Sequence, residues 1–480
     1  MRNRSTYSAF VTAAAAAALL LHSGCEEPKR LKAEQPHIIF LLIDALRKDH
    51  LSCYGYHWET TPVIDELAGN GVVFENAVAQ SPWTAPSMAS LFTSKRPLAV
   101  GVHATELDGG LRHLKKGRVT MLDGRHTTLA EILKAKGYAT IAVTVNALSS
   151  YHVNMVQGFD RHTYLVYQKA NTLMDQALTD IAQVTGPESP DRGKPIFLYV
   201  HFIDVHEPNN PAPPFDKLYP TLDSAPHVKD HTKWGYYRIN DPDDWGFRNF
   251  KSHKTALYDG ALSFVDDQIG RLIDCLKDMG LFDNAIFVIS ADHGEELWDH
   301  ALAEQAYRND PRGHYGVGHG HTMFAEVLDV PLVFHGPGVP TGVRVKQQVR
   351  NMDIAPTLLG LAGINRSGFG LDGVDLIEAM KTQTLSNLLA FSEDITYGYE
   401  EKCVQDAGFK YIRGRDYEFL FDKEKDPEEK VNLAKKRRGT KRKYSHILDA
   451  ILQGPQPAQG TPVIMTEELR EQLRQLGYME

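Results

Sequence analysis

The sequence predicts an α/β sandwich with a central, mostly parallel sheet flanked by helices, followed by a small C-terminal α+β subdomain. Continuous apolar runs alternate with amphipathic helical patterns over most of the 480 residues, and the pattern changes to shorter segments beyond about residue 370. Alternating strands and helices are typical of a parallel sheet covered on both faces. A chain of this length can bury one large core or two unequal ones.

Five apolar runs predict the central strands, because strands buried on both faces lack a polar side. Asp44, Asp204 and the pair Asp292–His293 stand where three of these runs end. Ligand sites of such sheets lie beyond the carboxyl ends of the strands. The runs cover residues 36–44, 138–146, 195–204, 284–294 and 330–336.

Three helical patterns lie between these runs and each ends in glycine, which suits a helix C-terminus. They are TTPVIDELAGNG at 60–71, TTLAEILKAKG at 127–137, and TALYDGALSFVDDQIGRLIDCLKDMG at 255–280.

Residues 371–480 are expected to form the C-terminal subdomain, a small sheet with a terminal helix over TEELREQLRQLGY. The segments LLAFSEDI, FKYIRG and YEFLFD predict its strands. The basic run KKRRGTKRKY at 435–444 is interpreted as a solvated surface loop, with contact to anionic lipid or polysaccharide as the alternative. A catalytic domain is expected over 36–370.

The N-terminal segment 1–25 has the anatomy of a signal peptide of the lipoprotein type, followed by a polar linker at 26–35. Acylation of Cys25 would anchor the protein to a membrane of the bacterial cell envelope, as a periplasmic or outer-membrane lipoprotein. His22 departs from the lipoprotein pattern, so plain export is the alternative. The net charge of −9 argues against a nucleic-acid partner, and four cysteines do not make a disulfide framework.

Asp44, Asp292 and His293 offer two carboxylates and an imidazole from separate strand ends, a mixture that suits manganese, zinc or calcium. Each residue alone could equally cap a helix or form a turn. Their joint place at one sheet edge favours one divalent metal ion.

Thr84, in SPWTAPSMASLF, precedes a helical stretch with Pro86 in its first turn. A hydroxyl on a divalent cation loses its proton readily and becomes a nucleophile, so Thr84 is a candidate fourth metal ligand. The N-terminus of the helix would favour a phosphate or sulfate. A plain helix cap needs the same placement, and the two roles are compatible.

Histidines in two further motifs are candidates for contact with an anionic ester. His201 and His206 stand in YVHFIDVHEP, and either could donate to an ester oxygen or protonate a leaving group. RGHYGVGHGHTMF holds His314, His319 and His321 among glycines, which leaves a second metal and a substrate clamp as alternatives. Arg47, Lys95 and Arg96 are candidates for gripping the anion.

Together these motifs resemble the sulfatase family of the alkaline-phosphatase superfamily, in its order and over most of the chain. The blocks that carry the likeness include IDALRKDHLSCYGY, TTPVIDELAGNGVVFENAVAQSPWTAPSMASLFTSKRP, YVHFIDVHEP, SADHGEE and GHGHTMFAEVLDVPLVFHGPG. The resemblance implies an alkaline-phosphatase-like fold, a metal held by Asp44, Asp292 and His293, and a covalent intermediate on Thr84. It also implies that His206 and His319 contact the ester group.

Several positions depart from the family's usual pattern. Its nucleophile motif is Cys or Ser, any residue, Pro, Ser, Arg, with the first residue oxidised to formylglycine; here residues 84–88 read TAPSM, and threonine is not a substrate for that oxidation. Ala45 stands where a second aspartate is frequent, which weakens the case for calcium. His321 stands in place of a lysine that grips substrate, so Arg47 and His321 are the expected substrate-binding residues.

A threonine nucleophile with an Asp–His pair resembles the phosphodiesterase, phosphopentomutase and lipoteichoic-acid-synthase branches of the superfamily. The sequence therefore favours hydrolysis of a phosphoester or phosphodiester slightly over a sulfate ester. The alternatives are a sulfuric ester hydrolase without formylglycine, a phosphoethanolamine- or phosphoglycerol-type transferase, and a surface lipoprotein that only binds. The expected partner is a small-molecule, glycan or lipid-linked anionic ester.

Overall fold

The computed structural model describes residues 35–105, 110–113, 119–222, 241–308, 310–454, 458 and 460–475. The expected signal peptide and almost all of the linker lie outside these residues, so lipidation of Cys25 stays a prediction. The chain from Ala33 to Glu480 forms one compact unit, and the boundary expected at 370 stays a prediction too. Within the described ranges, no helix is both long enough and apolar enough to cross a membrane.

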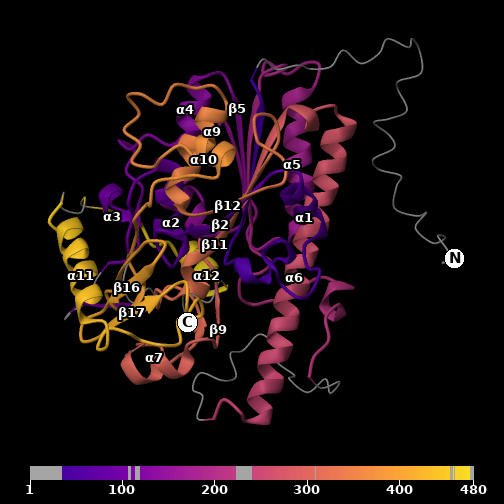
Figure 1. Ribbon diagram of the computed structural model, residues 1–480. Helices are drawn as coiled ribbons and strands as arrows, with labels where there is room; N and C mark the ends of the chain where they lie inside the picture. Colours follow the sequence, from indigo (N-terminus) through magenta and orange to yellow (C-terminus); the bar gives the residue numbers. More distant parts are fainter. Residues whose placement is uncertain are drawn as a thin grey trace. The chain divides into compact units, whose positions relative to one another are not determined.

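The core of the protein is an eight-stranded sheet, as the sequence predicts (Figure 1). All five predicted strands are present, and β11 alone runs antiparallel to its neighbours. In spatial order the strands are β12 (Val343–Arg350), β2 (Val72–Val78), β11 (Asp329–His335), β8 (Ala285–Ser290), β1 (His37–Ile43), β7 (Ile196–Phe202), β5 (Ala139–Thr144) and β6 (Arg161–Tyr164).

The register of the central strands brings the predicted site residues to one edge. In β1, Leu42 pairs in parallel with His201 of β7 and with Ser290 of β8. Asp44 therefore leaves the sheet beside His201 and close to Asp292. All residues of β1, β7 and β8 are buried, so this edge is reached only from beyond the strand ends.

Helices cover both faces of the sheet (Figure 1). One face carries α1 (Pro62–Gly69), α5 (Ala170–Thr185) and α6 (Trp245–Asp278), and the other carries α2 (Thr84–Thr93), α4 (Leu129–Ala135), α9 (Ile354–Leu361) and α10 (Ile377–Thr382). Gly137 and Gly280 follow α4 and α6 with φ of 93° and 69°, a conformation that glycine adopts without strain. The helical patterns read from the sequence are confirmed, although α6 starts earlier than its pattern.

A second, antiparallel sheet packs near the C-terminal end, formed by β13 (Ala390–Glu393), β15 (Lys402–Gln405), β16 (Phe409–Arg413) and β17 (Glu418–Asp422). Helix α11 (Arg438–Leu452) covers it, and α12 (Glu467–Gln475) ends the described chain. Most of the basic run 435–444 lies in α11. The run is largely exposed up to Tyr444, as expected, but it is not a loop, because buried Tyr444 and Leu448 anchor this stretch on the sheet as a helix.

Short elements complete the fold. They are α3 (Pro97–Val100), α7 (Ala301–Tyr307), α8 (Ala325–Leu328), β3 (Leu111–His113), β4 (Thr120–Met121), β9 (Glu296–Leu297), β10 (Val317–Gly318), β14 (Tyr397–Tyr399) and β18 (Thr461–Pro462). Cys53, Cys275 and Cys403 are free thiols, in agreement with a fold that relies on its core.

One buried carboxylate fastens the second sheet to the segment that leads into α2. Asp394, which follows β13, accepts hydrogen bonds from Arg112 Nη1 and, at 3.1 Å, from the backbone N–H of Ala104. Its carbonyl oxygen accepts the indole N–H of Trp83 at 2.6 Å. Since Trp83 directly precedes α2, this contact helps to set where that helix begins.

Replacing Asp394 by alanine is expected to cost about 1–3 kcal/mol of the free energy of unfolding, because Arg112 and the N–H of Ala104 would lose a buried acceptor while Arg112 keeps its ion pair with Glu400. Urea denaturation followed by circular dichroism measures this loss. Asp449→Ala is the control, since it removes a half-exposed ion pair with Arg413 and is expected to cost at most about 1 kcal/mol. Equal losses in the two variants would contradict this account.

Candidate metal and nucleophile site

Helix α2 begins with Thr84 and is tied to the end of β8. Trp83, in extended conformation, occupies the N-cap position, and Pro86 lies in the first turn. Ser87 Oγ donates to the carbonyl oxygen of Asp292 at 2.6 Å. This bond brings the first turn of the helix, and with it the Thr84 hydroxyl, next to Asp292 and His293.

Three oxygens converge on one nitrogen of His293. Its Nε2 lies 3.3 Å from Thr84 Oγ1, 3.5 Å from Asp44 Oδ1 and 3.4 Å from Asp292 Oδ2. The four residues that were expected to form the metal site are thus together, and all are fully buried.

The tautomer of His293 leaves Nε2 available as a ligand. Its Nδ1 lies 2.8 Å from the carbonyl oxygen of Gly294, which only accepts hydrogen bonds. Nδ1 therefore carries the proton, and Nε2 directs its lone pair at the three oxygens. Gly294 is required here, because a Cβ atom on it would lie 2.0 Å from the carbonyl oxygen of Glu326.

The spacing of these atoms fits a divalent cation. Ligand atoms held by one tetrahedral zinc ion at about 2.0–2.2 Å lie about 3.3–3.6 Å apart. The separations from His293 Nε2 fall in that interval, and they exceed the 2.7–2.9 Å that is common in charge-assisted hydrogen bonds. Asp44 Oδ1 and Asp292 Oδ2 accept no hydrogen bond although both are buried. Orphaned carboxylate oxygens at this spacing are what a cation would satisfy.

The electrostatics of the two carboxylates point the same way. Burial disfavours the charge of Asp44, but the hydrogen bond from His201 and the surrounding imidazoles lower its pKa well below the ordinary value. Burial and the negative charge of Asp44 raise the pKa of Asp292. Two neighbouring buried carboxylates cannot both stay ionised at low cost without a positive charge between them.

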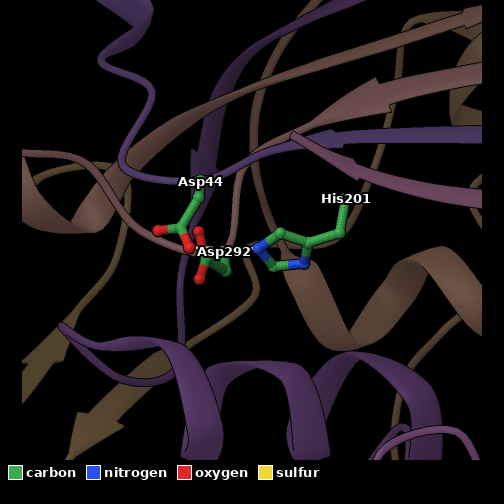
Figure 2. Close-up of side chains that lie close together, drawn as sticks. All are labelled: Asp44, His201 and Asp292. Atoms are coloured by element: carbon green, nitrogen blue, oxygen red, sulfur yellow. Dashed lines mark hydrogen bonds and ion pairs between the residues drawn. The ribbon is translucent and has the colours of Figure 1, made fainter. Parts of the chain in front are cut away.

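His201 directs its imidazole at Asp44 and Asp292 (Figure 2). Its Nε2 lies 3.0 Å from Asp44 Oδ2, and its Nδ1 lies 2.7 Å from the hydroxyl of Tyr199. With the Tyr199 O–H donating to Nδ1, the Nε2–H donates to Oδ2 and turns Oδ1 towards His293. Asp44, His201 and Asp292 form the group that is close enough together to share one metal ion here, and His293 lies beside it. The hydrogen bonds favour His201 as the residue that positions Asp44.

Asn146 is a site residue that the sequence analysis missed. Its amide nitrogen donates to Asp44 Oδ2 at 2.6 Å and to Thr84 Oγ1 at 3.4 Å. The signal was present, because Asn146 ends the apolar run 138–146 as Asp44 ends the run before it. An asparagine at a strand end is common in turns, so only the tertiary contact distinguishes it.

His206 and His319 form a second layer over the site. The ring centroids of His319 and His293 are 4.2 Å apart, and those of His319 and His206 are 4.8 Å apart. Burial and the two neighbouring imidazoles lower the pKa of His319 far below its ordinary value. Burial also opposes the charge of His206, but the carboxylates of Asp44 and Glu295 raise its pKa overall.

The other candidates lie in separate polar networks. The guanidinium of Arg47 contacts Asp49 at 2.7 Å and Asp299 at 2.5 Å. His321 faces Glu296 and Glu304. A substrate-binding role of Arg47 and His321 stays a prediction.

Three further candidates have structural contacts of their own. Asp204 accepts the backbone N–H of Ala170 at the start of α5. Lys95 donates to the carbonyl of Gly370, and Arg96 lies over the ring of Phe391.

Comparison with known proteins assigns the family. The sulfatase family model matches residues 36–364. The chain belongs to the sulfatase family. It is thus an ester hydrolase of the sulfatase and alkaline-phosphatase superfamily, a family that generally binds a divalent metal.

Related proteins agree in sequence and in fold. A sulfatase of Formosa agariphila is 25% identical over 467 residues, which cover 86% of each chain. The structure of Ps i-CgsB in complex with k-i-k-neocarrahexaose superposes with a TM-score of 0.67 at 19% identity, over 92% of this chain and 98% of the other. A phosphonate monoester hydrolase of Agrobacterium radiobacter superposes with a TM-score of 0.65 at 18% identity, over 87% of this chain and 95% of the other.

A variant of His201 tests how the site holds a cation. His201→Gln is expected to weaken the binding of Zn²⁺ or Mn²⁺ about 10–100-fold, as is typical when a residue that orients a ligand is lost. Asp292→Asn is expected to weaken it further, because a ligand oxygen loses its charge. Competition with a chromophoric chelator measures both, with His335→Gln at the far end of β11 as the control. An equal loss in the His201 and Asp292 variants would make His201 a ligand.

Proposed function

We propose that this protein is a metal-dependent hydrolase that cleaves a phosphate or sulfate ester through a covalent intermediate on Thr84. The observation that carries the proposal is the convergence of Thr84 Oγ1, Asp44 Oδ1 and Asp292 Oδ2 on His293 Nε2. A threonine that only capped a helix would not need two carboxylates and an imidazole around its hydroxyl.

Asp44, Thr84, Asp292 and His293 would hold the divalent cation. Bound there, it would lower the pKa of the Thr84 hydroxyl and offset the negative charge of the transferred group. The amide of Asn146 donates to Thr84 Oγ1 and favours the deprotonated oxygen. Thr84 stands at the N-terminus of α2, which would attract an anion.

The reaction proceeds in two displacements. In the first, Thr84 Oγ1 gives its proton to water and bonds to the phosphorus or sulfur atom, while the bond from that atom to the ester oxygen breaks. The departing oxygen takes a proton from His206, the imidazole above the site whose pKa is raised, while neutral His319 contacts the ester group. In the second, water attacks the same atom and gives one proton to His206, and the departing Thr84 oxygen takes a proton back from the solvent.

We favour a phosphoester or phosphodiester over a sulfate ester. Phosphoryl groups carry more negative charge than sulfuryl groups and gain more from a cation and an aligned nucleophile. Threonine cannot become formylglycine. A phosphonate monoester hydrolase shares the fold, which supports the same preference. Family membership favours the sulfate ester as the second candidate.

The substrate and the location follow from the same chemistry. We infer an anionic ester on a small molecule, a glycan or a lipid, met in the cell envelope if residues 1–25 act as a lipoprotein signal. A relative of the same fold in complex with k-i-k-neocarrahexaose supports the glycan choice. The phosphoethanolamine- and phosphoglycerol-type transferases differ only in the acceptor that takes the place of water.

Substitution of the nucleophile tests the mechanism. Thr84→Ala is expected to lower kcat at least about 10⁴-fold, because no oxygen remains to form the intermediate. Circular dichroism should show a folded protein. Thr93→Ala, in the same helix, is the matched control, since its hydroxyl only bonds to the carbonyl of Ala89. Full activity of Thr84→Ala would refute the proposal.

A panel of nitrophenyl esters separates the two substrate classes. The phosphate monoester, phosphodiester and sulfate ester share one leaving group, so their kcat/KM values differ only through the transferred group. We expect the highest value for one of the phosphorus esters, and loss of all three activities after chelation. Highest turnover of the sulfate ester, kept by a protein with unmodified Thr84, would establish the sulfatase alternative.

A further inference from the structure

A second buried cluster of carboxylates and imidazole lies beside the site described above. It comprises Glu296 in β9, Glu304 in α7 and His321 in the loop that follows β10. All three side chains are at most 1% exposed, and they lie close enough to share a metal ion. The steps of the proposed hydrolysis use none of them, and a cation at His321 would replace the substrate-binding role expected of that residue.

The distances repeat those at His293. His321 Nε2 lies 3.2 Å from Glu296 Oε2 and 3.3 Å from Glu304 Oε2. An imidazolium between two carboxylates would normally make bonds of about 2.7–2.9 Å. The observed separations are longer than that and lie at the lower end of the spacing of neighbouring ligands on a tetrahedral ion, about 3.3–3.6 Å.

The carboxylates are held in place by backbone groups. Glu296 Oε1 accepts the N–H of His300 at 2.8 Å, which leaves Oε2 for the cluster. Glu304 Oε2 accepts the N–H of Gly316 at 2.6 Å. Glu304 Oε1 is buried, accepts no hydrogen bond and faces Arg308 Nε at 3.7 Å. The fold thus holds Glu296 Oε2 and Glu304 Oε2 towards His321.

The cations around the cluster are shared with other carboxylates. Arg308 pairs with Glu401 at 2.5 Å and more distantly with Glu304, at 3.7 Å. His300 pairs with Glu326 at 2.6 Å. Glu296 and Glu304 therefore share His321 at close range, with Arg308 as a more distant counter-charge, and burial of this many carboxylates is costly. A divalent ion with a neutral His321 neutralises both.

A cavity gives access to the cluster. It has a volume of about 350 Å³, and its walls include His321, Arg308, Tyr397 and Tyr417. It provides an entry path for an ion and room for a water as the fourth ligand. The three side chains, their separations and the entry path all support a metal site.

We propose that Glu296, Glu304 and His321 form a second divalent-cation site, of the zinc or manganese class. It would join α7 to the two-stranded sheet of β9 and β10, in which Gly318 pairs with Glu296. His319 follows Gly318 directly, so an ion at His321 also restrains the imidazole that lies over the first site. The second site is a positioning site and stands whether or not Thr84 is the nucleophile.

Metal counting on the purified full-length protein tests this. Mass spectrometry of the protein, dialysed against Zn²⁺ and then against metal-free buffer, should find two ions per chain. His321→Gln and Glu304→Gln should each retain one, and so should Asp292→Asn. His300→Gln is the matched control, a neighbouring buried histidine paired with a glutamate, and should retain two.

A titration of the metal-free wild-type protein with Co²⁺ avoids any dependence on folding of the variants. Its visible absorption should rise in two saturating steps. A single step, or one ion in the wild type that His321→Gln retains and Asp292→Asn loses, would overturn the second site and leave the proposed function intact. One ion retained by Asp292→Asn and lost by His321→Gln would overturn the first site instead. Loss of an ion in His300→Gln but not in His321→Gln would overturn this ligand set.

Discussion

The burial of two carboxylates at the end of the central sheet is the constraint around which the rest of the site is organised. Asp44 and Asp292 are both fully buried, and each leaves an oxygen without a hydrogen bond. In a medium of low polarity, such a pair is stable only beside a positive charge. The polar groups nearby serve this requirement: His201 and Asn146 turn Asp44, and the Gly294 carbonyl sets the tautomer of His293.

The position of Thr84 follows from packing on both sides of the helix that carries it. Ser87 bonds the first turn of α2 to Asp292, just beyond β8. Trp83, the residue before the helix, bonds to Asp394 near the second sheet. Thr84, the proposed nucleophile, is therefore held by contacts from two regions that are about a hundred residues apart in the sequence. A substitution in the C-terminal part can reach the chemistry through Asp394 without touching substrate.

The two proposed cation sites would act differently on the histidine layer. An ion at His293 would lie near His319, whereas an ion at His321 would restrain the loop that follows β10. Glu295 lies 3.0 Å from His319 Nδ1 and would serve the first site. Glu296, the first residue of β9, would serve the second. This division gives neighbouring residues of the SADHGEE motif separate roles.

The sequence by itself determined the α/β class, the central strands and the principal helices, because burial on both faces produces apolar runs and glycine ends helices. It also identified Asp44, Thr84, Asp292 and His293 as site candidates, since each stands at the end of a strand or the start of a helix. Only the tertiary structure showed that β11 runs antiparallel and that residues 438–444 are helical. It alone revealed Asn146, the role of His201 and the partners of Arg47 and His321. These depend on contacts between residues far apart in the chain, and no local pattern records which of several polar side chains will meet.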